Sequence, residues 1–346
     1  MTNIQLINKL SNEGILEKEE LVQLLSSYSA KDMEFARSMA RETAQKYFGN
    51  KIYIRGLIEF TNICRQNCLY CGLRAENGNA SRYRLTKEDI IECCRMGYPL
   101  GFRTFVLQGG EDPHFDDDLV CDILKSIKKE FPDCAVTLSI GEKSRDTYQK
   151  YFDAGADRYL LRHETANAEH YSQLHPKNLS LASRKECLFT LKDIGFQTGC
   201  GFMVGSPYQT ADTLAEDLLF IHQLQPQMVG IGPFVPHKDT PFGNQPQGSL
   251  ELTLFLLALV RIMQKNVLLP STTALGTIHP QGREMGILSG ANVVMPNLSP
   301  LSVRKKYMLY NGKISTDEEA AEGIEALMKR MKKIGYEITV SRGDHQ

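Results

Sequence analysis

The chain has 346 residues, of which 42% are hydrophobic and 23% charged, and its formal net charge at pH 7 is −1. This is the composition of a globular protein with a large core, and a nearly neutral chain without a basic block argues against nucleic-acid and anionic-membrane partners. No apolar run reaches the roughly 18 residues of a membrane span, and residues 1–4 do not begin a secretion signal, so we expect a cytoplasmic protein. In that reducing compartment the nine cysteines serve as metal ligands or core residues rather than in disulfides.

The first 50 residues have the pattern of an amphipathic helical segment. Leu21, Leu24 and Leu25 recur at helical spacing, as do apolar residues between 33 and 47, and Gly49 with Asn50 ends the pattern. We therefore expect residues 1–50 to form an N-terminal helical cap across one end of the remaining chain.

Residues 51–346 are predicted to form one structural unit in which short apolar strands alternate with amphipathic helices. Near-continuous apolar strands of this kind are typical of a parallel sheet covered by helices, and eight of them predict an α/β fold with a complete (β/α)8 TIM-type barrel. The eighth barrel helix is expected at 317–334, after a capping box at residues 316–319. The strands are expected at 52–59, 104–108, 135–139, 158–162, 197–203, 228–231, 267–269 and 291–295, and the helices between them at 86–96, 117–130, 144–153, 182–193, 212–223, 250–264 and 282–288.

Polar or glycine-containing motifs follow each predicted strand at its carboxyl end. In an α/β barrel these ends all meet at one face, which carries the active site. The recurrence of the motifs there predicts one shared cavity. They comprise residues 64–71, 108–111, 139–142, 162–165, 205–207, 232–237, 272–277 and 295–297.

The most specific motif is the C-x3-C-x2-C spacing of Cys64, Cys68 and Cys71, with no further Cys or His nearby before Cys93. A structural zinc takes four ligands, and a cubane iron–sulfur cluster usually takes four thiolates. Three cysteines can hold three irons of a cubane and leave the fourth open to an outside ligand. A zinc site completed by a distant cysteine, or unligated buried cysteines, stay open as alternatives.

This spacing, with Tyr70 before the last cysteine, resembles that of the radical S-adenosylmethionine (SAM) superfamily. The resemblance implies a [4Fe–4S] cluster whose fourth iron binds the amino and carboxylate groups of SAM. An electron from the cluster then cleaves SAM to a 5′-deoxyadenosyl radical. The resemblance also implies a barrel of the radical SAM type.

Longer segments are similar to the HydE family, the radical SAM maturases of FeFe-hydrogenase. That resemblance implies a role in assembly of the hydrogenase H-cluster and a small organometallic or thiol-containing substrate. It also implies a reductant such as ferredoxin or flavodoxin, with other hydrogenase maturases as possible partners. The similar segments are residues 58–74, 106–113, 158–167, 228–241, 272–277 with 283–284, and 290–300.

Roles for individual residues follow from the resemblance by position. Cys64, Cys68 and Cys71 would ligate the catalytic cluster. Tyr70 would lie near the adenine of SAM, and the other residues expected to bind SAM are Gly110, Glu111, Ser139, Glu164 and Arg184. The residues expected to line the substrate cavity are Gln108, Arg162, Thr272, Thr273, Met295, Tyr307 and Tyr310.

Several alternatives remain from the residues themselves. Without the resemblance, Thr272 and Thr273 could serve only to cap a helix. Tyr307 and Tyr310 could close the barrel mouth or only pack under the last helix. No cysteine follows Cys200, so the second cluster that some HydE proteins carry is not expected. The competing functions are carbon chemistry, as in methylornithine synthase or biotin synthase, and a non-catalytic iron–sulfur scaffold.

Overall fold

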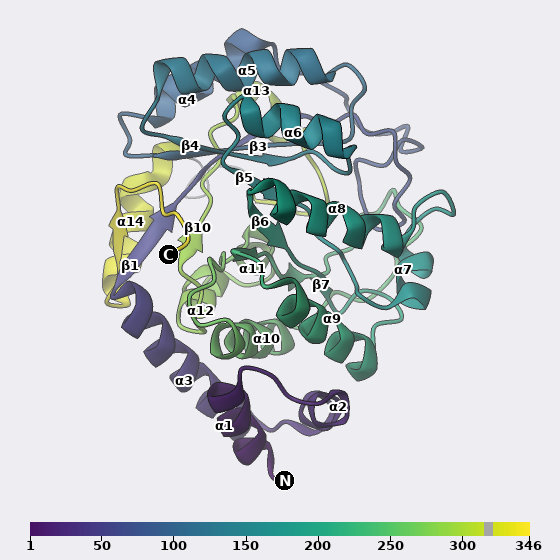
Figure 1. Ribbon diagram of the computed structural model, residues 1–346, viewed down its shortest axis with the longest axis vertical. Coiled ribbons are helices and arrows are strands. Elements are labelled where there is room, and N and C mark those ends of the chain that lie inside the picture. Colours follow the sequence, from purple (N-terminus) through teal and green to yellow (C-terminus); the bar gives the residue numbers. More distant parts are fainter. Residues whose placement is uncertain (315–320) are drawn as a thin grey trace.

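In the computed structural model, all residues are described except 315–320 and the side chain of residue 322. The core is a ring of parallel strands (Figure 1). Its first strand is divided at Arg55 into two pieces, and its seventh position is formed by residues 267–270. The named strands of the ring are β1 (Lys51–Ile54), β2 (Gly56–Thr61), β3 (Thr104–Gly109), β4 (Ala135–Ser139), β5 (Arg158–Leu160), β6 (Gln197–Cys200), β7 (Met203–Val204), β8 (Met228–Val229), β9 (Gly232–Pro233) and β10 (Val293–Val294).

Pairing between neighbours closes this ring. Strands β2, β3, β4, β5, β6 and β8 pair in that order, and β10 pairs with β1. Isolated parallel bridges complete the circuit, from Met228 to Leu268, from Pro270 to Val293, and from Asn297 to Leu57. The predicted TIM-type α/β barrel is therefore confirmed.

The helices of the outer layer follow the strands, as predicted. In α5, for example, the Asp116 side chain accepts a hydrogen bond from the backbone N–H of Leu119, and apolar residues on one face are buried. This helix begins and ends where the sequence pattern places it. The outer helices are α4 (Lys87–Gly97), α5 (Asp117–Glu130), α6 (Arg145–Asp153), α8 (Leu181–Ile194), α9 (Ala211–Leu224), α10 (Leu250–Met263), α12 (Gly282–Ile287) and α14 (Ile324–Lys333).

Several short elements were not predicted, because each has too few residues for a periodic pattern. They are α7 (Ala168–Leu174), α11 (Thr273–Ile278), α13 (Leu301–Arg304) and β11 (Glu337–Thr339). In the described part of the helix predicted at 317–334, Ala321–Gly323 form the 3-10 helix η2 and the α-helix begins only at Ile324. The capping box predicted at 316–319 lies outside the described residues.

β11 and the tail after it close the amino-terminal end of the barrel. β11 pairs with β1, and the fully buried guanidinium of Arg158 donates hydrogen bonds to the Arg342 carbonyl at 2.7 Å and to Asp344 at 2.6 Å. A ligand therefore has access to the barrel interior from the opposite, carboxyl-terminal end.

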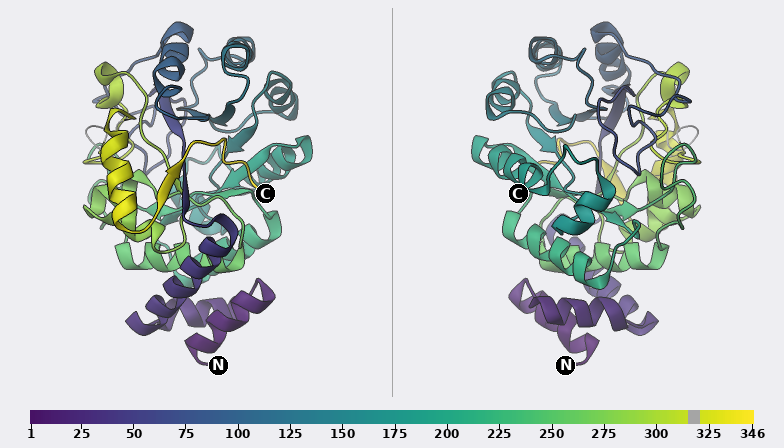
Figure 2. Two further views of the ribbon diagram at one scale, coloured as in Figure 1. Left: turned by 90° about the vertical axis from the view of Figure 1, so that its left-hand side faces the viewer. Right: turned by 90° about the vertical axis from the view of Figure 1, so that its right-hand side faces the viewer.

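The N-terminal residues form α1 (Asn3–Glu13), α2 (Lys18–Ser27) and α3 (Ala30–Phe48). These helices lie against the outer helices α9 and α10, as Figures 1 and 2 show. Tyr28 stacks on Phe255 with ring centroids 4.4 Å apart, and Lys18 pairs with Glu216 at 2.8 Å. The division of the chain at residue 50 into cap and barrel stays a prediction. Among the described residues, no helix is long and apolar enough to cross a membrane.

Candidate active site

A cavity of about 340 Å³ lies at the carboxyl ends of the barrel strands. Every residue that the sequence assigned to the cluster, to SAM or to the substrate lines this one cavity. Glu59, Gln66, Gly141 and Lys313 also line it, and the sequence assigned no role to them. The structure thus brings together residues from all parts of the barrel.

The cysteine loop after β2 is held in shape by one arginine. The Arg82 guanidinium donates hydrogen bonds to the carbonyls of Asn62 and Leu73 through Nη1, at 2.6 and 2.9 Å. Through Nη2 it reaches the carbonyls of Arg74 and Asn77, at 2.7 and 3.2 Å. Because these carbonyls flank the three cysteines on both sides, Arg82 fixes the path of the whole loop.

The three thiols are partly buried in the cavity wall. The backbone N–H groups of Gln66 and Leu73 donate to the sulfurs of Cys64 and Cys71, each at 3.4 Å. Burial, and then the neighbouring thiols, raise the pKa of Cys68, and burial raises that of Cys71 to about 12. Thiols in such a place ionise when a cation binds them, and the N–H donors would stabilise the resulting thiolates.

Within the described part of the chain, no three His, Cys, Asp or Glu side chains converge as ligands of a single metal ion do. A tetrahedral zinc requires that convergence. The thiolates of a cubane cluster bind separate irons and need not converge on one point. Cys64, Cys68 and Cys71 offer three thiols on one loop, which fit three separate irons of a cubane cluster.

Two glycines allow the strand ends to approach closely. A Cβ at Gly110 would lie 2.2 Å from the Ile63 carbonyl oxygen, so the glycine lets β3 pack against the cysteine loop. A Cβ at Gly141, where φ is +80°, would lie 2.4 Å from a carboxylate oxygen of Glu111. The Glu111 carboxylate itself accepts hydrogen bonds from Arg65 Nε at 3.1 Å and Gln66 Nε2 at 2.8 Å.

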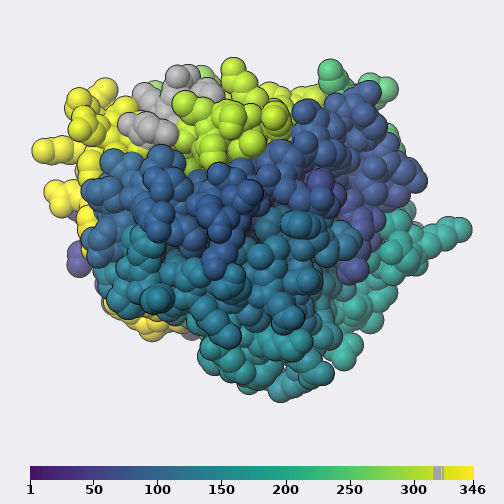
Figure 3. Space-filling model, turned by 90° about the horizontal axis from the view of Figure 1, so that it is seen from above, coloured from purple at the N-terminus to yellow at the C-terminus, as the bar shows by residue number. Residues whose placement is uncertain are grey.

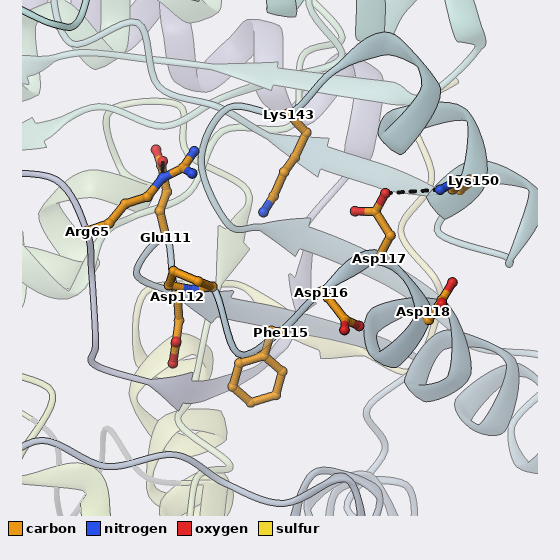
Figure 4. Close-up of a pocket in the computed structure, with 10 residues that line it drawn as sticks. Arg65, Glu111, Asp112, Phe115, Asp116, Asp117, Asp118, Lys143 and Lys150 are labelled. Atoms are coloured by element: carbon orange, nitrogen blue, oxygen red, sulfur yellow. Dashed lines mark hydrogen bonds and ion pairs between the residues drawn. The ribbon is translucent and has the colours of Figure 1, made fainter.

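Glu111 also borders an open, charged hollow of about 370 Å³ on the outer surface (Figure 4). Asp117 in this hollow accepts hydrogen bonds from Thr147 at 2.9 Å and Lys150 at 3.3 Å. Lys143 extends into the hollow from the loop after β4. The thiols and the other predicted site residues lie on the other side of Glu111, in the barrel cavity.

The end of β5 carries a buried ion pair whose polar atoms make few hydrogen bonds. Arg162 Nη2 lies 3.2 Å from Glu164 Oε2, yet neither atom makes a hydrogen bond, and Arg162 Nε has no partner either. All three atoms are buried. Glu164 has a φ of +64°, a conformation that is strained for a residue with a side chain. Buried polar atoms that lack hydrogen bonds, together with local strain, are typical of binding sites, and these groups suit a polar ligand.

His163, between these two residues, points away from the cavity. It is fully buried and packs against Phe202 and Phe220, and its Nδ1 accepts a hydrogen bond from the Gly201 N–H at 3.3 Å. Burial lowers the pKa of His163 far below its usual value, so it is neutral. The strand end thus presents Arg162 and Glu164 to a ligand and uses His163 for packing.

Arg184, at the start of α8, is oriented from two sides. Its Nε donates to Glu142 Oε1 at 2.5 Å, and its Nη1 donates to the Arg162 carbonyl at 2.7 Å. The residue is only 8% exposed, and it lines the cavity. A guanidinium fixed in this way suits a carboxylate, which it binds by charge-assisted hydrogen bonds.

Tyr70 is positioned by a histidine that the sequence did not reveal. His175 Nδ1 lies 3.0 Å from the Tyr171 carbonyl, which can only accept, so Nδ1 carries the proton. His175 Nε2 is then the acceptor for the Tyr70 hydroxyl at 3.2 Å. Burial lowers the pKa of His175 to about 3, so this neutral arrangement persists at physiological pH. The ring of Tyr70 thereby has a fixed orientation in the cavity wall.

The residues predicted to meet the substrate include further polar groups. Tyr307 is buried, and its hydroxyl accepts a hydrogen bond from Gln108 Nε2 at 3.3 Å. Thr272 occupies the N-cap position of α11, but its side chain makes no capping hydrogen bond and its buried hydroxyl has no partner. The hydroxyl is therefore available to a ligand. Thr273, Met295 and Tyr310 complete this part of the lining.

Comparison with known proteins agrees with this geometry. Residues 58–221 match the family model of the Radical SAM superfamily. Over 335 residues the chain is 47% identical to the [FeFe] hydrogenase maturase subunit HydE of Thermotoga maritima, covering 97% of this chain and 95% of that protein. The chain belongs to the HydE family. As a radical SAM enzyme of this family, it uses a [4Fe–4S] cluster and SAM.

More distant relatives share the fold of this HydE-family protein. The chain is 27% identical over 324 residues to 3-methylornithine synthase of Methanosarcina acetivorans, which covers 93% of this chain and 90% of that protein. A crystal structure of methylornithine synthase superposes with a TM-score of 0.85 at 25% identity, covering 96% and 97% of the two chains. A crystal structure of the maturase HydG superposes with a TM-score of 0.82 at 20% identity, covering 98% and 76%, which supports the fold alone.

Proposed function

We propose that this HydE-family protein acts in assembly of the metal centre of [FeFe] hydrogenase. Its substrate would be a small precursor that carries iron and sulfur. The observation that carries the proposal is the 47% identity to a HydE maturase over nearly the whole chain. The single cavity that gathers the predicted cluster, SAM and substrate residues supports it.

The cofactors, when bound, supply a 5′-deoxyadenosyl radical. In the proposal, Cys64, Cys68 and Cys71 hold the cluster, and their spacing leaves one iron for SAM. Arg184 would bind the carboxylate of SAM, and Tyr70 would pack near its adenine. Further SAM contacts would come from Gly110, Glu111, Ser139 and Glu164, which line the same part of the cavity.

The substrate would bind deeper in the barrel. Thr272 offers a buried hydroxyl that no protein group uses, and Gln108 and Tyr307 form a polar pair. Arg162 offers a buried guanidinium whose Nε has no hydrogen-bond partner and whose Nη2 forms an ion pair with Glu164 at 3.2 Å. Such donors suit a cyanide or carboxylate ligand of an iron complex, because a buried donor is satisfied only by an acceptor. The remaining residues proposed for this part are Thr273, Met295 and Tyr310. As partners we propose a low-potential reductant such as ferredoxin or flavodoxin, and other hydrogenase maturases.

Two assays test this proposal. The anaerobically reconstituted protein, given dithionite and SAM, should release 5′-deoxyadenosine, and a non-catalytic scaffold would release none. A cell-free hydrogenase assembly mixture that lacks its own HydE should regain hydrogen turnover when the protein is added. Cleavage of SAM without restored hydrogen turnover would contradict the maturation role but support the radical SAM activity.

Methylornithine synthase is the second candidate, because its structure superposes over 96% of this chain. Formation of 3-methylornithine in an extract supplemented with the protein would favour it. A biotin synthase-like reaction has less support, because the described residues that line the cavity include no cysteine besides Cys64, Cys68 and Cys71 to hold a second cluster.

A further inference from the structure

Residues 305–314, here called the strap, follow α13 and cross the cavity at its carboxyl-terminal mouth. The Lys306 carbonyl accepts a hydrogen bond from Asn62 at 2.8 Å, and the Leu309 carbonyl accepts one from the Gly72 N–H at 2.9 Å. In Figure 3 the yellow-green surface of this part of the chain borders the blue surface of the segment after β2. The strap is therefore joined to the cysteine loop.

The strap is also joined to the loop that follows β9. The Asn311 N–H donates to the Pro236 carbonyl at 3.0 Å, and the Asn311 side chain accepts from the Lys238 N–H at 3.1 Å. Between its two attachments the strap contributes Tyr307 and Tyr310 to the cavity lining. Any substrate in the cavity thus lies against the strap.

One buried ion pair links the strap to the barrel wall. Lys313 Nζ donates to Glu59 Oε1 at 2.5 Å, and the two side chains are 4% and 0% exposed. Both residues line the cavity. Lys313 Nζ also lies 5.1 Å from the ring centroid of Tyr307. The pair therefore contacts the strap residue that the substrate would meet.

Glu59 is fixed independently of Lys313. Its second carboxylate oxygen accepts from Asn297 Nδ2 at 2.8 Å, its N–H donates to Ser299 Oγ at 2.8 Å, and its carbonyl accepts from the Tyr83 hydroxyl at 2.7 Å. Because the carboxylate is held by the barrel wall, it is a fixed partner for the Lys313 ammonium group of the strap.

A buried ion pair is a poor source of stability, because desolvation of the two charges offsets their attraction, and an apolar pair of similar volume often replaces it without loss. A buried ion pair instead fixes the relative position of its two side chains, since each charge needs the other as its partner. We propose that Glu59 and Lys313 are positioning residues that hold the strap closed and fix Tyr307 against the substrate. Breaking the pair uncouples SAM cleavage from substrate turnover. The claim that SAM cleavage becomes uncoupled rests on the proposed maturation function. The claim that the ion pair holds the strap does not depend on it.

The test uses the reconstituted holoenzyme with the Lys313→Met variant and the double variant Glu59→Gln, Lys313→Met. The double variant removes both charges, so it folds even if an unpaired Glu59 prevents the single variant from folding. Lys128→Met is the matched control, because Lys128 pairs with Asp157 at 3.3 Å on the outside of the barrel. Iron content and SAM affinity should equal those of the wild type in all variants.

Two measurements decide the proposal. Amide hydrogen exchange in a peptide covering 305–314 should accelerate about tenfold in both Lys313 variants and remain unchanged in Lys128→Met. The amount of 5′-deoxyadenosine released per unit of hydrogenase activated should rise about tenfold, and Lys313→Arg should restore part of the coupling. Unchanged exchange in the strap, or a loss of iron that accounts for the change in activity, would overturn the proposal. If the wild type activates no hydrogenase, the maturation function fails, and the exchange result still decides whether the pair holds the strap.

Discussion

Replacement of Arg82 by methionine tests whether one side chain organises the cysteine loop. The substitution keeps much of the apolar stem and removes four hydrogen bonds to loop carbonyls. We count about 1 kcal/mol for each, below the usual value for a charged donor, because Arg82 is only partly buried and water can replace part of each bond. The loop should then be less stable by about 4 kcal/mol, which is close to a thousandfold change in its opening equilibrium.

Hydrogen exchange gives the direct measurement. The amides of Ala75 and Asn77, which donate within the loop to Gln66 and Arg74, should exchange far faster in Arg82→Met. The iron content after reconstitution should fall, because the thiols no longer share one geometry.

Arg95→Met is the matched control for this prediction. Arg95 pairs with Glu130 at 2.7 Å on the outer surface and is half exposed, so its removal should leave the stability and the iron content nearly unchanged. Wild-type exchange and iron content in Arg82→Met would refute the reasoning.

Three further predictions concern other parts of the site. Cys68→Ala should abolish both the cluster absorbance and SAM cleavage, and retention of either would argue against ligation. Thr272→Val removes a buried hydroxyl that no protein group uses, so the substrate concentration for half-maximal hydrogenase activation should rise about tenfold, while SAM cleavage without substrate stays unchanged; an unaltered concentration dependence would mean that the hydroxyl meets no ligand. Burial lowers the pKa of His175 to about 3 in the folded protein. Between pH 6.5 and pH 3 the unfolded chain therefore binds a proton on His175 that the folded protein does not bind. The folded protein consequently loses stability as the pH falls below 6.5. When the pH falls from 7 to 5, the free energy of unfolding measured with urea should decrease by about 2 kcal/mol less in His175→Gln than in the wild type. An equal decrease in both proteins would contradict this.

The sequence by itself determined the barrel and the face that carries the site. Apolar strands alternate with capped amphipathic helices along the chain. This local pattern predicts a parallel sheet covered by helices, because such strands must be buried on both faces. The cysteine spacing was compatible with an incomplete cubane, and its resemblance to the radical SAM superfamily indicated the cofactors. The motifs at strand ends predicted one shared cavity, since parallel strands bring their carboxyl ends to one face, and the resemblance added Arg184, Tyr307 and Tyr310 to its lining.

Only the tertiary structure revealed the groups that position these residues. Arg82, His175 and the Glu59–Lys313 pair have no local signal in the sequence, because their partners lie at other positions and an isolated charge is usually a surface residue. The structure also separated His163, which packs against Phe220 of the outer helix α9, from Arg162 and Glu164, which line the cavity. Neighbouring residues on a strand face opposite sides, and the direction of each side chain is decided by what the folded barrel places beside it.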